Sequence, residues 1–275
     1  MIKIILFVLV LSMESKICAQ TAFSDQEKGD KRIEVASNGT IYVFNLSTSV
    51  LSRYSENGEL KYSIGGQGFS DDRFDRPKSF HLSAGLTLLV CDTGNKRVVI
   101  YDRNLQKIGE INQESSPKLE NWSPEFVVMN NVGQIWVCDS ENQRIIQFDE
   151  NGYLRFEVFL PEEIDVNSID NFLLSQNYLW LIDESKHISY RFSNLGKYQL
   201  FMALPKDVKR VKSINRMIMG IQGHELVQIA ENGTIVSTMK GIDFQKAEKK
   251  ITGWSLMSKS LLIGTQSSFQ LFPIK

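Results

Sequence analysis

Residues 60–111 read LKYSIGGQGFSDDRFDRPKSFHLSAGLTLLVCDTGNKRVVIYDRNLQKIGEI, and residues 124–157 repeat the plan as PEFVVMNNVGQIWVCDSENQRIIQFDENGYLRFE. In each stretch a proline opens the unit, an apolar strand ends in Val-Cys-Asp, and a polar turn of the form Asp-Thr/Ser-x-Asn-x-Arg follows. A second apolar strand then ends in an aromatic residue and a turn. Self-similarity at this period indicates one supersecondary unit repeated along the chain, and a series of such units closes into a ring.

The repeated unit resembles the NHL repeat, which builds a family of β-propellers. In that family a glycine-rich segment with Gly-x-Phe and Pro precedes a strand that ends in Val-Ala-Asp-Thr/Ser-x-Asn-x-Arg. Here Cys91 and Cys138 stand where the family usually has alanine. The resemblance is specific over residues 60–157 and implies an all-β propeller. The glycine-rich segment is formed by Gly65, Gly66, Gly68, Phe69, Phe74 and Pro77.

Six copies of a third-strand marker predict a six-bladed β-propeller with four-stranded antiparallel blades. The marker is a bulky residue before a turn, and four of the turns carry Asn-Gly or Leu-Gly, as hairpin connections often do. The markers are Tyr54, Tyr101, Phe148, Phe192, Ile229 and Phe272. A five-bladed ring would require one marker to be discarded, and Ile229 is the least regular. The blades are predicted at roughly 32–66, 77–111, 124–159, 165–203, 207–240 and 250–275.

The sixth copy stops soon after its third strand. We therefore expect a strand from the N-terminal part of the chain to close the ring, because closure removes two exposed sheet edges. Residues 20–26, or the start of the first unit, would supply this strand.

The first 19 residues have the pattern of an export signal. Lys3 precedes an apolar run over residues 4–13 that is too short to span a membrane, and Ala19 is a small residue before a cleavage site. We therefore predict a signal peptide at 1–19 and a single propeller domain at 20–275. The protein is then periplasmic, on the cell surface or secreted. A lipid anchor at Cys18 is the alternative.

The composition excludes some partners. The net charge is −1, and it becomes −2 without residues 1–19, which hold two lysines and one glutamate. This balance and the export signal both argue against nucleic acid, and no later apolar run is long enough to cross a membrane. We predict that Cys91 and Cys138 are buried and unpaired, because equivalent positions of neighbouring blades lie too far apart for a disulfide.

The polar turns are interpreted as scaffold. Asp and Asn side chains cap the backbone of their own turn, and the arginine is expected to bind a carboxylate or carbonyl in the same or the adjoining blade. Repetition argues against a reactive site, since chemistry is rarely duplicated from blade to blade. The structural motif residues are Asp92, Asn95, Arg97, Asp139, Asn142 and Arg144.

No pattern in the sequence marks a catalytic residue, a cofactor or a metal site. The three histidines are not spaced as ligand pairs, and no Cys-x-x-Cys, Gly-x-Ser-x-Gly or phosphate-binding loop occurs. His81 follows Pro77 on a predicted innermost strand and could face the central channel. His187 and His224 fall in turns between second and third strands.

A candidate binding surface is predicted around the most charged loop, residues 69–76. Arginines and aromatic residues concentrate at binding surfaces, although a solvated loop with Phe69 and Phe74 packed between blades is the alternative. Lys206, Lys209, Arg210 and Lys212 are interpreted as a solvated basic face. The candidate binding residues are Arg73, Phe74, Arg76, His81 and Trp122.

The function predicted first is an exported, non-catalytic module that binds a protein or an envelope component through one face of the ring. The alternative is a lactonase-like or lyase-like propeller enzyme with a divalent metal in the channel. A third possibility, a small-ligand sensor, requires aromatic residues such as Trp122 to be exposed. A propeller scaffold by itself does not distinguish among these functions.

Overall fold

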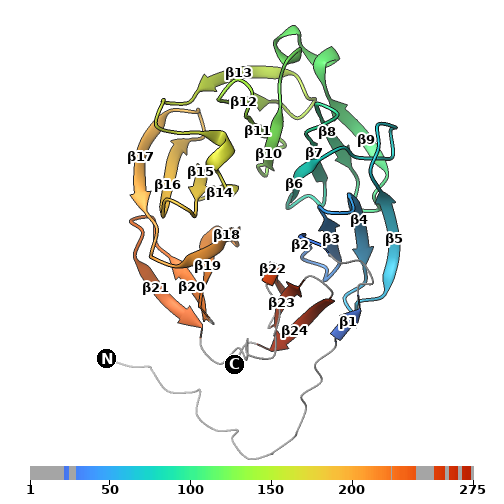
Figure 1. Ribbon diagram of the computed structural model, residues 1–275, viewed down its shortest axis with the longest axis vertical. Coiled ribbons are helices and arrows are strands. Elements are labelled where there is room, and N and C mark those ends of the chain that lie inside the picture. The colour runs from blue at the N-terminus through green and yellow to red at the C-terminus, as the bar shows by residue number, and fades with distance from the viewer. Residues whose placement is uncertain are drawn as a thin grey trace, which may run out of the picture.

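The computed structural model describes residues 22–24, 29–223, 225–239, 251–257, 260–265 and 268–273. Antiparallel four-stranded sheets surround a central axis as the blades of a propeller (Figure 1). Within these ranges the helices are three short 3₁₀ turns, and none is long or apolar enough to cross a membrane. They are η1 (Gln113–Ser115), η2 (Pro117–Leu119) and η3 (Val166–Ser168).

Five blades are each formed by four consecutive strands. The first two are β2 (Lys31–Val35), β3 (Ile41–Asn45), β4 (Val50–Tyr54), β5 (Leu60–Gly65), and β6 (Pro77–Leu82), β7 (Leu88–Asp92), β8 (Arg97–Tyr101), β9 (Lys107–Ile111). The third and fourth are β10 (Pro124–Met129), β11 (Ile135–Asp139), β12 (Arg144–Phe148), β13 (Leu154–Phe159), and β14 (Asn171–Ser175), β15 (Tyr178–Asp183), β16 (Ile188–Ser193), β17 (Tyr198–Ala203). The fifth is β18 (Val208–Ile214), β19 (Met217–Gln222), β20 (Glu225–Ile229) and β21 (Ile235–Met239).

The remaining four-stranded sheet joins the two ends of the described chain. β22 (Ile251–Met257), β23 (Ser260–Thr265) and β24 (Ser268–Pro273) are completed by β1 (Ala22–Ser24). β1 pairs antiparallel with β24, with Phe23 opposite Phe269. The predicted six-bladed propeller is corrected here, because only five blades are formed by consecutive strands, and the remaining sheet is a composite of both ends of the described chain. The pairing of β1 with β24 agrees with the closing strand expected from residues 20–26. The physical reason is edge pairing, since β1 supplies backbone partners along the outer edge of β24.

A shared turn joins the third and fourth strands of the five continuous blades. Each sheet shifts register by one residue just before this turn, as in a bulge that follows a type I turn. The predicted markers of these five blades lie at this bulge. In four blades a glycine shortly after the marker has positive φ, and in the β6–β9 blade Leu105 takes its place with φ 65°. The glycines are Gly58, Gly152, Gly196 and Gly233, with φ between 75° and 83°.

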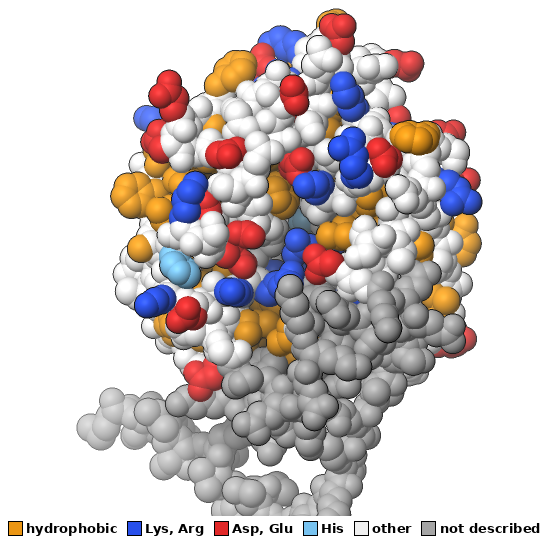
Figure 2. All heavy atoms as spheres, in the orientation of Figure 1, with side chains coloured by type: hydrophobic (Ala, Val, Ile, Leu, Met, Phe, Trp, Pro, Cys, Tyr) orange, Lys and Arg blue, Asp and Glu red, His pale blue; other side chains and the backbone are white. Residues whose placement is uncertain are grey.

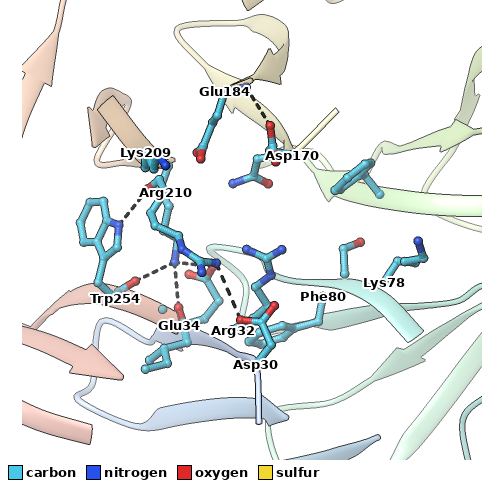
Figure 3. A pocket seen from close by; sticks show the side chains of 16 residues that line it. Asp30, Arg32, Glu34, Lys78, Phe80, Asp170, Glu184, Lys209, Arg210 and Trp254 are labelled. Atoms are coloured by element: carbon cyan, nitrogen blue, oxygen red, sulfur yellow. Dashed lines mark hydrogen bonds and ion pairs between the residues drawn. The ribbon is translucent and has the colours of Figure 1, made fainter. Parts of the chain in front are cut away.

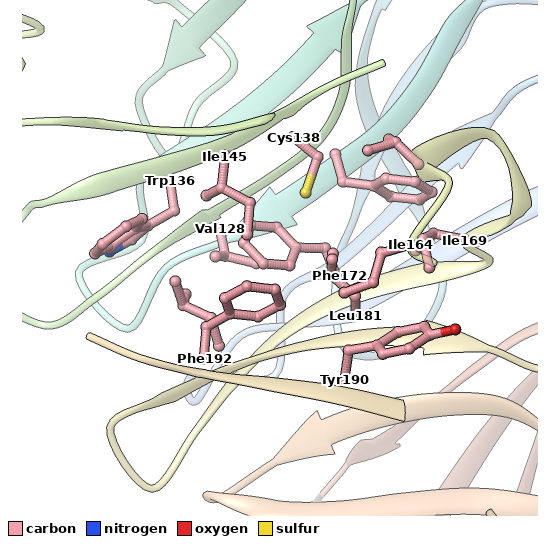
Figure 4. Close-up of a cluster of buried hydrophobic side chains, with 13 residues drawn as sticks. Val128, Trp136, Cys138, Ile145, Ile164, Ile169, Phe172, Leu181, Tyr190 and Phe192 are labelled. Atoms are coloured by element: carbon pink, nitrogen blue, oxygen red, sulfur yellow. The ribbon is translucent and has the colours of Figure 1, made fainter. Parts of the chain in front are cut away.

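The hydrophobic core lies between neighbouring blades. Figure 4 shows the cluster where β10–β13 meets β14–β17, in which Trp136, Cys138 and Phe192 are fully buried. Cys91 lies in the next cluster, and both cysteines are free, as predicted. Burial raises the pKa of both thiols. Because similar clusters lie between the successive sheets, each blade depends on its neighbours for burial of its apolar faces.

Candidate functional site

The first polar turn is a buried network, as its interpretation as scaffold predicts. The carboxylate of Asp92 is fully buried, and its Oδ2 accepts hydrogen bonds from Asn95 Nδ2 at 2.7 Å and Arg97 Nε at 2.8 Å. Arg97 Nη2 donates to the carbonyls of Ser70 and Arg73, at 3.0 and 2.7 Å. The arginine therefore fastens the loop that enters the blade to the turn between β7 and β8.

The second turn repeats this arrangement one blade further. Asp139 Oδ2 accepts from Asn142 Nδ2 at 2.8 Å and from Arg144 Nε at 2.7 Å. Arg144 also donates to the Lys118 carbonyl at 2.8 Å and pairs with Glu157 on β13. The Asp–Asn and Asp–Arg contacts are the same in both blades, as a structural role for these six motif residues requires.

The histidines are separated in space. His81 lies on β6, the innermost strand of its blade, mostly buried, with Nε2 3.3 Å from the Met129 carbonyl. His187 lies in the β15–β16 turn at φ 55°, the position that Lys96 and Gln143 occupy at φ 50° and 47° in other blades. His224 lies outside the described residues. Among the described residues, no three His, Cys, Asp or Glu side chains gather as a metal site would require.

Burial lowers the pKa of His81 below its ordinary value. Below pH 6.5 the unfolded chain therefore binds a proton that the folded chain does not, so folding loses stability as the pH falls. We expect urea unfolding between pH 7.5 and pH 5 to show this loss, by up to about 1.4 kcal/mol for each pH unit in that window. His81→Gln should flatten that part of the profile. An unchanged slope in the variant would contradict the assignment.

Two of the predicted binding residues are buried and cannot form a binding surface. Phe74 is fully buried in the core between the first two blades, with its ring 5.4 Å from that of Phe44. Trp122 is also fully buried, and its Nε1 donates to the Lys96 carbonyl at 2.8 Å. The prediction was wrong here because both side chains fill gaps between blades. The small-ligand sensor hypothesis required Trp122 to be exposed, and Trp122 is buried.

The other members of that predicted surface stay apart. Arg73 and Arg76 are exposed, and Arg76 contacts its neighbour Asp75 at 3.4 Å. His81 lies inside the channel instead. Phe69 is 80% exposed, so only one of the two phenylalanines of the loop packs between blades. The five residues therefore do not form one site.

The structure brings a different set of residues together at one end of the channel. A cavity of about 360 Å³, here called the mouth cavity, opens where the innermost strands begin. Figure 2 shows basic and acidic side chains interspersed around the central hollow. Phe80, Phe126 and Trp254 form apolar parts of the cavity wall. The charged residues that line it are Asp30, Glu34, Asp170, Glu184, Arg32, Lys78, Lys209, Arg210 and Lys212.

One pair at the base of the mouth cavity is firmly held. Lys212 Nζ lies 2.8 Å from Glu34 Oε1 and donates to the carbonyls of Ile33 at 2.7 Å and Trp254 at 3.2 Å. These contacts join β18, β2 and β22 across the channel. Both members of the pair also line an inner cavity of about 120 Å³ that contains His81, so the pair lies between the two spaces.

Other charges of the mouth cavity are loosely paired. Lys78 Nζ is 3.4 Å from Glu125 with its side chain 54% exposed, and Arg210 is 3.8 Å from Asp30. Pairs of this kind contribute about 0–1 kcal/mol. Arg210 also has φ 57° within the register shift of β18, a conformation that is uncommon for a long side chain.

Burial perturbs two further charged groups of the mouth cavity. It lowers the pKa of Arg32 and raises the pKa of Glu184. Both shifts mean that the charged form loses hydration. The cavity therefore contains charges that water and neighbouring groups compensate incompletely.

Sequence reasoning missed this site, although a signal was present. Pro77 and Pro124 stand at the same register of β6 and β10, opposite Asp92 and Asp139. The next residue of each strand, Lys78 or Glu125, is charged, and Arg32 and Lys209 are likewise second in β2 and β18. Superposing the repeats would have placed these charges at one end of the ring.

The basic cluster was also misinterpreted. Lys209, Arg210 and Lys212 line the mouth cavity and do not form only a solvated face. The reason is the ring geometry, because β18 is the innermost strand of its blade and begins at the channel end.

A sequence model of the NHL repeat matches residues 121–148, the unit that carries the second turn motif. The chain is a β-propeller that contains an NHL repeat. No curated protein sequence matches this NHL propeller. Solved structures do resemble it.

A catalytically inactive virginiamycin B lyase from Staphylococcus aureus, solved with quinupristin, gives a TM-score of 0.68 at 12% identity over 93% of this chain and 98% of the lyase. A streptogramin B lyase gives 0.64 at 14% identity over 93% and 97%. BBS1N in complex with ARL6DN gives 0.57 at 12% identity over 89% and 78%. At these identities the likeness to the NHL propeller shows the fold alone.

Proposed function

We propose that this NHL propeller is an exported, non-catalytic module that binds a charged segment of a protein partner, or of another envelope component, at the mouth cavity. The observation that carries this proposal is the set of charged side chains of both signs around the open end of the channel. Loosely paired charges such as Lys78 and Arg210 can exchange a weak internal partner for a group on the ligand. Complementary charges of this kind confer specificity and fast association.

Two further observations support the partner class and the location. BBS1N, which shares the propeller-like fold, was solved in complex with another protein, ARL6DN. Export rests on the signal-like sequence of residues 1–19, which lie outside the described residues. The opposite end of the channel offers a cavity of about 740 Å³ in which Glu34 and Glu56 are the charged residues among the described lining, so charge favours the mouth cavity.

The test is capture of partners from the source envelope with tagged wild-type protein, Lys78→Glu and Lys61→Glu. Lys61 is the matched control, because it lies on the outer strand β5, far from the channel, and forms an exposed ion pair with Glu59. We expect a stoichiometric partner to bind the wild type and Lys61→Glu, and at least about tenfold less of it to bind Lys78→Glu, since the change places two glutamates together.

Two results would count against the proposal. Equal capture by Lys78→Glu and the wild type would place the binding surface elsewhere on the ring. Failure to recover any stoichiometric partner from the envelope would argue against a protein-binding module.

A further inference from the structure

Arg32 is the second residue of β2, and its guanidinium is directed into the mouth cavity (Figure 3). Among the sixteen residues that line the cavity, none is joined to Arg32 by a hydrogen bond or an ion pair. The side chain is partly buried, and Arg210 lies near enough for like-charge repulsion. A guanidinium has five N–H donors in a planar fork, so leaving it unpaired in a partly desolvated site is costly.

The nearby carboxylates interact with other groups, Asp30 only loosely. Glu34 pairs with Lys212 at 2.8 Å, and Asp30 lies 3.8 Å from Arg210. Across the cavity, Asp170 accepts from the backbone N–H of Glu184 at 2.7 Å. Glu184 in turn accepts from the Val211 N–H at 2.9 Å. Asp30, Asp170 and Glu184 favour the charged form of Arg32 through space. None of the four acids forms the two-pronged pair that a guanidinium can make with a carboxylate.

We propose that Arg32 is the receptor for a carboxylate of the bound segment, supplied either by an Asp or Glu side chain or by a C-terminal carboxylate. This deepens the proposed function and rests on it for the source of the carboxylate. A planar carboxylate matches the fork of Arg32 and can accept two parallel hydrogen bonds. The volume of the mouth cavity falls within the range of about 300–1,000 Å³ typical of ligand sites.

The mouth cavity is lined by four acidic and five basic residues, so a ligand that carries charges of both signs matches it better than a free anion such as phosphate. Asp170 and Glu184 suit a basic group next to the carboxylate of the ligand. The occupant with the best charge match is therefore a peptide segment in which an acidic group adjoins a basic residue.

The experiment is a titration of the full propeller followed by the Arg Nε–Hε signals in NMR and by calorimetry. The probes are acetyl-Gly-Glu-Lys-Gly-amide, acetyl-Gly-Lys-Gly with a free C-terminus, and the neutral-acid control acetyl-Gly-Gln-Lys-Gly-amide. Inorganic phosphate is the fourth probe. We expect one or both carboxylate peptides to shift the Arg32 signal and to bind at least about tenfold more tightly than the Gln peptide. The carboxylate peptide that binds more tightly shows whether a side chain or the C-terminus supplies the carboxylate.

Variants decide whether Arg32 is responsible. Arg32→Gln should weaken carboxylate binding at least about tenfold, whereas Arg155→Gln should leave it unchanged, because Arg155 is exposed on the outer strand β13. Arg32→Gln should melt at the same or a higher temperature than the wild type, since it removes an unpaired charge. A melting curve therefore separates lost binding from lost folding.

The proposal is overturned if the Gln peptide binds equally, if Arg32→Gln binds the carboxylates as the wild type does, or if phosphate binds more tightly than either peptide. The titration uses no native partner, so its outcome is independent of the capture experiment. If partner capture depends on Lys78 but the peptides do not bind at Arg32, the binding module is supported and the Arg32 proposal is rejected. If the peptides bind at Arg32 but no partner is captured, the Arg32 proposal is supported and the binding module is rejected.

Discussion

Replacing Arg144 with methionine should lower the free energy of unfolding by about 3–5 kcal/mol, the loss typical when one member of a buried ion pair is removed. Arg144 is 5% exposed and Asp139 is fully buried, and their Nε and Oδ2 atoms are 2.7 Å apart. Without the guanidinium, the buried Asp139 carboxylate loses its charged partner. The Lys118 carbonyl and Glu157 also lose their partner.

Urea unfolding followed by fluorescence measures this loss. Arg155→Met in the same blade is the matched control, because Arg155 is exposed and lies 3.7 Å from Asp149, so the expected loss is about 0–1 kcal/mol. The double variant Arg144→Met/Asp139→Asn should lose less than the sum of its single changes, since each removes the same interaction. A loss below about 1 kcal/mol for Arg144→Met would show that the motif does not hold the blade.

Trp122→Ala should cost about 3–5 kcal/mol, the range for truncating a buried aromatic residue. The indole is fully buried, its ring centroid is 6.2 Å from that of Phe148, and its N–H donates to the Lys96 carbonyl. Removing it leaves a cavity between the second and third blades and a carbonyl without its donor. Thermal and urea unfolding measure the loss.

Phe69→Ala is the control for this change. Phe69 is 80% exposed on the loop that leads into β6, so its truncation should alter stability by no more than about 0.5 kcal/mol. If Trp122→Ala were as stable as Phe69→Ala but weakened ligand binding, the tryptophan would be a binding residue after all. The expected result is a large loss of stability for Trp122→Ala and almost none for Phe69→Ala.

The sequence was most informative where local chemistry repeats. The Asp-x-x-Asn-x-Arg turns specified their own partners, because Asp, Asn and Arg satisfy one another within six residues of chain, and both copies fold as expected. Likewise, the markers Tyr54, Tyr101 and Phe148 each end the third strand of a blade. Such signals depend on near neighbours and need no knowledge of the ring.

Residue type was a poor guide to exposure in the loops between blades. Phe69 and Phe74 lie five residues apart in one polar loop, yet Phe69 is exposed while Phe74 is fully buried. Trp122 follows a similar loop and is also buried. Which aromatic side chain enters the gap between two blades depends on the neighbouring blade, and that packing is absent from any local pattern.

By itself, the sequence determined the repeated blade, the hairpin turn after its third strand, the Asp-Asn-Arg turn motif and the burial of Cys91 and Cys138, since these follow from hydrogen bonds and apolar periodicity within one unit. Only the tertiary structure decided what lies at the centre of the ring. Arg32, Lys78, Glu184 and Arg210 come from four different blades into one cavity. Closing the ring brings the start of every innermost strand to one point, which is why the mouth cavity emerges only in three dimensions.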